Sequence, residues 1–135
     1  MEITRRTDYG IRLLLQLARS DEGPVPVRRL AEIQGVPYAF ARAVQRDLHA
    51  AGLITTVRGA QGGAFLSRPA KEITLLDAVK ATQGAPSISV CSHDPAWCAR
   101  SGSCAVHGVW RGADAMLRDY LGRKTLAGLL DDERK

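Results

Sequence analysis

The sequence is poor in aromatic residues and contains no long uninterrupted apolar run. Phe, Trp and Tyr make up 5% of the 135 residues, so the core has to come mainly from Leu, Val, Ile and Ala. No apolar stretch approaches the roughly 20 residues of a membrane-spanning helix. The N-terminus is not followed by the apolar segment and small-residue cleavage site of a secretory signal. These absences, with a length suited to one compact domain, lead us to expect a cytoplasmic protein.

The sequence also lacks the side-chain patterns that accompany catalysis. It has no paired carboxylates beside its cysteines, no His-Glu metal helix and no nucleophile motif. The acidic residues of the second half, Asp114, Asp119 and Asp131-Asp132-Glu133, are interpreted as solvated charge. We therefore predict that the chain is not an enzyme, and a small metalloenzyme or electron carrier is a remote alternative.

Positive charge is concentrated in the first half of the chain. The formal net charge is +5. Residues 1–71 hold 11 Lys/Arg and 6 Asp/Glu, whereas residues 72–135 hold 8 of each. A positive field of this kind attracts a polyanion such as DNA. The alternative is a solvated basic surface without a partner, so a motif within the basic half has to decide.

The basic half has the pattern of a winged helix. Apolar residues within 4–19 predict a buried helix, and a short helical segment from Val27 stops at Gly35. A second helix is expected from Tyr38 to Ala51. The β-rich segments 53–57 and 64–67 flank a glycine-rich turn and predict a hairpin. Helix, glycine-containing turn, helix and hairpin form the winged helix-turn-helix order, and Thr74 is a candidate N-cap for a further helix ending near Gly84.

One face of the helix 38–51 is suited to reading DNA. Arg42, Gln45, Arg46 and His49 share a polar face, separate from the apolar face of the helix. Arg can bond guanine with two hydrogen bonds, and Gln can bond adenine. An ordinary exposed helix face is the alternative reading. We predict DNA contacts from Arg28, Tyr38, Arg42, Gln45, Arg46, Arg58 and Gly62.

All three cysteines, Cys91, Cys98 and Cys104, lie in one short segment bearing Pro and Gly. An odd number argues against a disulfide framework. Thiolates gathered on a loop suit a soft metal or an iron–sulfur cluster, and the spacing departs from the Cys-x2-Cys pairs typical of zinc. His107 stands at Cys-x-x-His as a possible fourth ligand, and His93 lies inside the loop. Redox-active thiols without metal, or inert cysteines in a dimer contact, remain alternatives.

A long helix is expected after the loop, from about Cys104 to Gly122. Its apolar stripe includes Val106, Val109, Trp110, Ala113, Leu117, Tyr120 and Leu121. Little chain remains to cover that stripe, so we predict a homodimer. The fold expected is mainly α with a small β-hairpin wing. It divides into a winged helix-turn-helix domain at 1–84, a cysteine cluster-binding loop at 85–104, and a dimerisation helix and tail at 105–135.

Several motifs together resemble one known family over nearly the whole chain, from Thr7-Asp8-Tyr9-Gly10 to Thr125-Leu126-Ala127-Gly128-Leu129. The most specific stretches are Val57-Arg58-Gly59-Ala60-Gln61-Gly62-Gly63, Leu66-Ser67-Arg68-Pro69 and Glu72-Ile73-Thr74-Leu75-Leu76-Asp77. The three cysteines followed by Val106-His107-Gly108-Val109-Trp110 complete the match. The chain is thereby identified as similar to the Rrf2 family of winged-helix regulators, the group of IscR, NsrR and RirA.

The resemblance implies a homodimer that reads a palindromic site in double-stranded DNA. The lack of a long apolar run predicts no membrane partner. The resemblance also implies an iron–sulfur cluster on the loop, with [4Fe-4S] slightly favoured over [2Fe-2S]. IscR-like proteins take a histidine at the position of His107 as the fourth ligand. NsrR-like proteins can take an aspartate from the other subunit, at the position of Asp8, which is slightly favoured here. The function implied is a repressor that senses nitric oxide, iron or redox state, with thiol switching without a cluster as the alternative.

Overall fold

Most helices and the hairpin of the chain assemble around one central helix. The computed structural model describes all residues, 1–135. The helices are α1 (Arg5–Arg19), α2 (Val27–Gln34), α3 (Tyr38–Ala50), α4 (Leu75–Gln83), α5 (Val90–His93), α6 (Ala105–Gly122) and α7 (Leu126–Glu133). Two strands, β1 (Ile54–Val57) and β2 (Gly63–Leu66), and two 3-10 turns, Ala70–Glu72 and Pro95–Trp97, complete the chain. The mainly α fold with a hairpin wing is confirmed.

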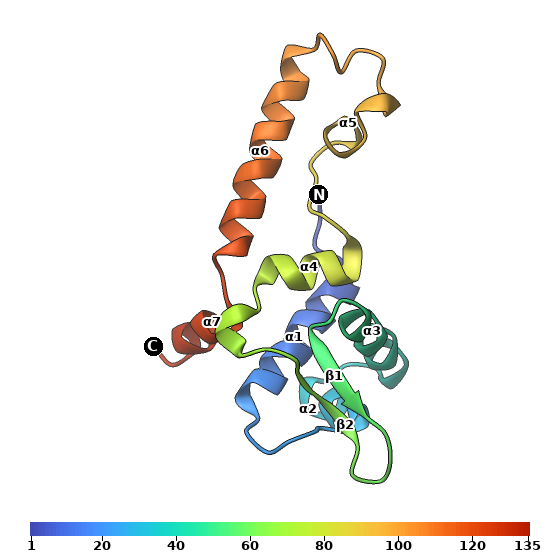
Figure 1. Ribbon diagram of the computed structural model, residues 1–135, viewed down its shortest axis with the longest axis vertical. Helices are drawn as coiled ribbons and strands as arrows, with labels where there is room; N and C mark the ends of the chain where they lie inside the picture. Colours follow the sequence, from blue (N-terminus) through green and yellow to red (C-terminus); the bar gives the residue numbers. More distant parts are fainter.

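Helix α1 is the axis of the winged-helix body (Figure 1). It begins because the side chain of Thr4 caps it, accepting a hydrogen bond from the backbone N–H of Thr7. Leu13, Leu14 and Leu17 of α1 belong to a single hydrophobic core that also includes buried residues of α2, α3, α4 and both strands. Burial of one such side chain stabilises the fold by roughly 1.5–3 kcal/mol, so α1 holds the body together.

The helix-turn-helix consists of α2 and α3. α2 ends at Gly35, and α3 buries Ala41, Val44 and Leu48. The strands then pair antiparallel from Ile54↔Leu66 to Val57↔Gly63. The hairpin is fixed to the body by an isolated bridge between Val25 and Ala64. Gly63 permits this approach, because a Cβ there would lie 2.3 Å from the carbonyl carbon of Val25.

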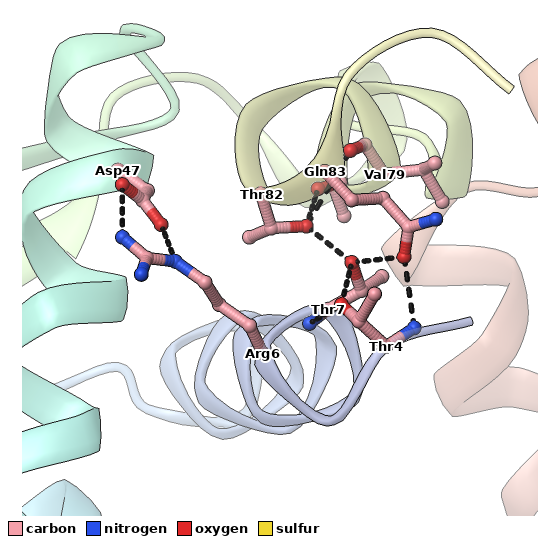
Figure 2. A network of polar contacts seen from close by, with 8 residues as sticks. Thr4, Arg6, Thr7, Asp47, Val79, Thr82 and Gln83 are labelled. Atoms are coloured by element: carbon pink, nitrogen blue, oxygen red, sulfur yellow. Dashed lines mark hydrogen bonds and ion pairs between the residues drawn. The ribbon is translucent and has the colours of Figure 1, made fainter. Parts of the chain in front are cut away.

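A polar junction at the start of α1 joins it to α4 and α3 (Figure 2). The hydroxyl of Thr7 bonds Thr82 at 2.7 Å and the side-chain carbonyl of Gln83 at 2.6 Å. The same Gln83 oxygen accepts the backbone N–H of Thr4 at 2.9 Å. On the other side, Arg6 donates to both carboxylate oxygens of Asp47 on α3, at 2.5 and 2.8 Å. One helical turn therefore contacts both α3 and the end of α4.

Helix α6 projects away from the body, and α5 lies beside its distal half (Figure 1). The sequence predicted no regular structure in residues 85–103, whereas the structure has the short α5 and one 3-10 turn there. Four and three residues are too few for a periodic pattern to be visible in the sequence. No helix in the chain combines the length and the apolar character that crossing a membrane requires.

The C-terminal tail returns to the winged-helix body. Leu126 of α7 is fully buried in the same core as α1, and its backbone N–H bonds the carbonyl of Ile73 at 2.9 Å. Leu75 at the start of α4 donates in turn to the carbonyl of Lys124 at 2.8 Å. The sequence prediction grouped residues 105–135 as one unit, whereas the structure packs α7 on the winged-helix body.

Candidate nucleic-acid interface and cysteine loop

The outer face of α3 carries the side chains predicted to read bases. Arg42, Arg46 and His49 are exposed, and neither arginine is engaged in an ion pair. Gln45 differs, because it is half-buried and its Oε1 atom is buried without a hydrogen-bond partner. The structure therefore brings two free guanidinium groups onto one exposed helix face, with an unsatisfied amide beside them.

The turn between α2 and α3 carries a second basic group. Arg28 is exposed on α2, and its guanidinium carbon lies 4.2 Å from the centroid of the Tyr38 ring at the start of α3. A cation–π contact of this kind is worth about 0.5–1 kcal/mol at an exposed site. Arg28 and Tyr38, both predicted DNA contacts, are therefore adjacent and mutually oriented at the start of the recognition helix.

The wing places its basic residue at the tip. Arg58 is exposed in the turn between β1 and β2, whereas Arg68 beyond β2 leans toward Asp77, with 3.7 Å between its Nη2 and the Oδ2 atom. Gly62 is buried rather than free to approach a ligand, since a Cβ there would stand 2.1 Å from the carbonyl oxygen of Val57. The turn itself thus requires glycine at 62, and a DNA contact by Gly62 stays a prediction.

The three cysteines are free thiols placed along the loop before α6. Cys91 lies in α5, Cys98 follows the 3-10 turn, and Cys104 is the residue immediately preceding α6. Cys91 and Cys98 are half-buried and Cys104 is exposed. The structure does not bring the three thiols together, since the chain contains no group of three His, Cys, Asp or Glu side chains at metal-binding distance.

The two candidate fourth ligands have different surroundings. His107 is buried at 9% exposure on α6, and its Nδ1 atom has no hydrogen-bond partner. Asp8 lies in the first turn of α1, about half exposed, and pairs with Arg12 at 2.9 Å. No hydrogen bond or ion pair joins Asp8 to the cysteine loop of its own chain. Thiolates and an unsatisfied imidazole nitrogen are donor types that iron–sulfur clusters and other soft metal centres take.

The prediction that Asp114 is solvated is wrong. Asp114 is 2% exposed on α6, and its Oδ1 accepts the backbone N–H of Ile88 at 2.8 Å. Burial alone would raise the pKa of Asp114. Hydrogen bonds from Ser92, Ile88 and Ser87, with the charge of Arg118, outweigh that effect and hold its pKa below the ordinary value.

Two structural features near these surfaces were not predicted from the sequence. The Arg6–Asp47 pair joins residues 41 positions apart and leaves no local pattern. Asp114 did carry a usable signal, because it stands seven residues after His107 and so shares its helix face. The spacing from His107 therefore predicts the side of α6 on which Asp114 lies, which the number of acidic residues in the helix does not.

Comparison with known proteins assigns the family. A family profile described as "Rrf2: Iron-dependent Transcriptional regulator" matches residues 3–132. The chain is 32% identical to Protein rrf2 of Nitratidesulfovibrio vulgaris over 98% of this chain and 89% of that protein. The structure of T. potens IscR superposes with a TM-score of 0.77 at 27% identity, over 98% of this chain and 88% of that one. Oxidized Staphylococcus aureus CymR gives 0.71 at 30% identity, over 96% and 95%.

These matches agree with the geometry described above. The profile covers the winged helix, the loop and the long helix together, and the solved relatives share the fold over nearly the full chain. The family consists of DNA-binding regulators and not of enzymes. The chain belongs to the Rrf2 family of DNA-binding transcriptional regulators.

Proposed function

We propose that this regulator is a homodimeric repressor whose binding to a palindromic DNA site is controlled by an iron–sulfur cluster on the cysteine loop. The signal is nitric oxide, iron supply or redox state. The proposed sensing role is supported by one observation. Every cysteine of the chain lies within residues 91–104, directly before α6.

The DNA-reading part of the proposal rests on α3 and its surroundings. Arg42 and Arg46 are exposed and unpaired on the recognition helix, and Arg28 is stacked on Tyr38 beside it. Arg58 at the wing tip extends the basic surface. A recognition helix supplies base contacts in the major groove, while flanking cations neutralise phosphates. We assign Arg42 and Arg46 to base edges, and Arg28 and Arg58 to the backbone.

The cluster part of the proposal rests on donor chemistry. Cys91, Cys98 and Cys104 would supply three thiolates. The fourth ligand would be Asp8 of the second subunit or the unpartnered His107 nitrogen. Such a cluster supplies a centre that reacts with nitric oxide and oxidants and is lost when iron is scarce. [4Fe-4S] is favoured slightly over [2Fe-2S] through the resemblance to NsrR-like proteins.

The dimer part of the proposal rests on the uncovered apolar stripe of α6. Val106, Val109 and Tyr120 are 49%, 62% and 55% exposed, and Trp110 is 38% exposed. Large apolar side chains exposed repeatedly along one helix indicate an interaction surface. A second α6 is the cover that fits, since a twofold contact lets the same stripe meet itself and places two recognition helices on one duplex.

A second candidate mechanism is thiol switching without iron. The chain is similar to the oxidized form of S. aureus CymR at 30% identity, and its own cysteines are free and at least partly accessible. In this mechanism oxidation of the loop thiols would replace loss of a cluster as the event that alters DNA binding. The two mechanisms predict different iron contents for the same purified protein.

The test is to purify the protein anaerobically and record its native mass spectrum, visible absorption, iron and acid-labile sulfide. A brown dimer carrying iron and sulfide is the expected result, and its mass distinguishes two irons from four. DNA binding by the holo and cluster-free forms should then differ. A colourless protein that stays iron-free after reconstitution would leave the thiol mechanism, and equal DNA affinities of all forms would remove the sensing role.

A further inference from the structure

We infer that Asp114 is a positioning residue for Cys91, fixing the first cysteine of the loop against the long helix α6. The part played by Cys91 as a cluster ligand rests on the proposed function. The contacts that hold Cys91 in place do not, because they are formed by the chain alone. Asp114 would therefore act on the loop with or without iron.

The inner face of α6 is polar where the loop packs on it. The buried residues of α6 are His107 and Asp114, seven positions apart and hence on one face, two turns from each other. α5, which contains Cys91, packs against this helix, as Figure 1 shows. The apolar stripe containing Val109 and Trp110 lies on a different face and is exposed. One face of α6 thus serves the loop and another is free for a partner.

Asp114 accepts hydrogen bonds from the chain just before Cys91. Its Oδ1 accepts the backbone N–H of Ile88 at 2.8 Å, and its Oδ2 accepts the hydroxyl of Ser87 at 3.3 Å. The same Ser87 oxygen lies 2.9 Å from the hydroxyl oxygen of Ser92, and Ser92 donates to the carbonyl of Ser89 at 2.7 Å. The segment 87–92 is therefore tied into a small network with the carboxylate of Asp114 as its only acidic member.

Cys91 stands inside this network, whereas the middle of the loop does not. Its Sγ atom is 3.3 Å from the hydroxyl oxygen of Ser89, within hydrogen-bond range for sulfur. Across residues 94–104 the hydrogen bonds that the structure contains are short-range backbone bonds, such as Ser101 to the Cys98 carbonyl. No side chain of that stretch bonds another element. Cys91 is thus held in place by a network that includes Asp114 of α6, and Cys104 is held by its position immediately before α6. Cys98 has neither kind of contact.

Because Asp114 is buried, we expect its removal to change the local structure of the segment that it contacts. A buried carboxylate persists only when donors satisfy its oxygens, and here the donors all come from the segment beside Cys91. Replacing Asp114 by Ala leaves the Ile88 N–H and the Ser87 hydroxyl without their acceptor. The segment 87–92 then opens more often, and the thiol of Cys91 is exposed to reagents during each opening.

The test measures alkylation of each thiol separately, in reduced, iron-free, full-length protein. The protein is treated with N-ethylmaleimide, samples are quenched over time with excess dithiothreitol, and the alkylated fraction of each cysteine is quantified by mass spectrometry. In Asp114→Ala we expect the Cys91 rate to rise about fivefold, the change that loss of one ordinary hydrogen bond produces in a local opening equilibrium. The rate at Cys98 should stay unchanged. Asp119→Asn, an exposed carboxylate on the same helix paired with Arg123, is the matched control and should leave all rates unchanged.

Two further variants keep the inference falsifiable if Asp114→Ala does not fold. Asp114→Asn retains an acceptor for Ile88 but loses the second one for Ser87, and Ser87→Ala removes the hub of the network. Both should raise the rate at Cys91 selectively. An unchanged Cys91 rate, or equal increases at all three cysteines, would overturn the inference. A wild-type protein that never takes up iron would refute the cluster proposal while leaving this measurement intact.

Discussion

The pair formed by Arg6 and Asp47 gives the sharpest prediction about DNA recognition. Arg6 on α1 makes a two-pronged contact with the carboxylate of Asp47 on α3 (Figure 2). The perturbation is Arg6→Gln, which removes the cation and leaves an acidic side chain uncompensated on the recognition helix. The pair has two effects, which the variant removes. It helps to orient α3 relative to α1, and it neutralises the charge of Asp47.

The expected magnitudes separate these effects from general destabilisation. Because Arg6 is 48% exposed and Asp47 22% exposed, solvent screens the pair, and it should contribute only about 0.2–1 kcal/mol to the free energy of unfolding. The electrostatic effect on DNA is additional. An unpaired charge at about 10 Å from a phosphate interacts by roughly 0.4 kcal/mol in water, and several phosphates lie near a bound recognition helix. We expect a loss of DNA affinity of about threefold to tenfold.

The assay is fluorescence anisotropy with a duplex that the wild-type protein has selected from a random pool, at fixed salt. Arg6→Gln should bind more weakly, and Arg6→Gln with Asp47→Asn should recover most of the loss because the bare carboxylate is gone. Arg19→Gln breaks the Arg19–Glu133 pair at 2.5 Å, at the other end of α1, and should leave affinity unchanged. Wild-type affinity in Arg6→Gln, or no recovery in the double variant, would refute the reasoning.

Three other predictions follow from single side chains. Arg46→Gln should weaken binding to the selected duplex by about 1–3 kcal/mol if it makes a bidentate base contact, whereas unchanged anisotropy titrations would displace it from the reading face. Val109→Glu, at a residue 62% exposed, should convert the dimer to monomer in native mass spectra, and an intact dimer would contradict the assignment of α6. Because the pKa of Asp114 is lowered in the folded chain, its stabilising effect is present above its unfolded pKa of about 3.9. That effect is lost as pH falls through the lower folded value. The difference in unfolding midpoint between wild type and Asp114→Asn should therefore be constant near neutral pH and shrink in acid.

The winged-helix body was predictable because its signals are local. Gly35 ends α2, Thr74 caps α4, and the glycine-rich turn joins two β-rich segments. Each of these depends on residues a few positions apart, and hydrophobic periodicity locates the longer helices. The capping box of Thr74 with Asp77 shows the same locality, since each side chain bonds the backbone of the other.

The features that the sequence did not reveal depend on distant partners. Nothing near Asp114 shows that Ser87 and Ile88 will fold back onto it from 26 or 27 positions earlier. The return of Leu126 to the α1 core likewise needs the whole intervening helix to turn the chain round. A charged residue on an amphipathic helix is usually solvated, so composition alone favoured the wrong surroundings for Asp114.

In the proposed sensor, α6 itself connects the cysteine loop to the DNA-binding body. A structural change at the loop therefore needs no separate domain to reach that body. The inner face of α6 holds the loop through Asp114, its apolar stripe is exposed, and the chain beyond it re-enters the α1 core at Leu126. Under the proposed function a change at the cysteines acts on a helix that is fixed at its far end to the body. A displacement of that helix relative to its partner would alter the spacing of two recognition helices, and binding requires both to meet successive major grooves. Under the proposed function, α6 would therefore couple the loop, the dimer contact and the recognition helix. A ligand at the loop could shift the equilibrium only by its differential affinity for the two arrangements.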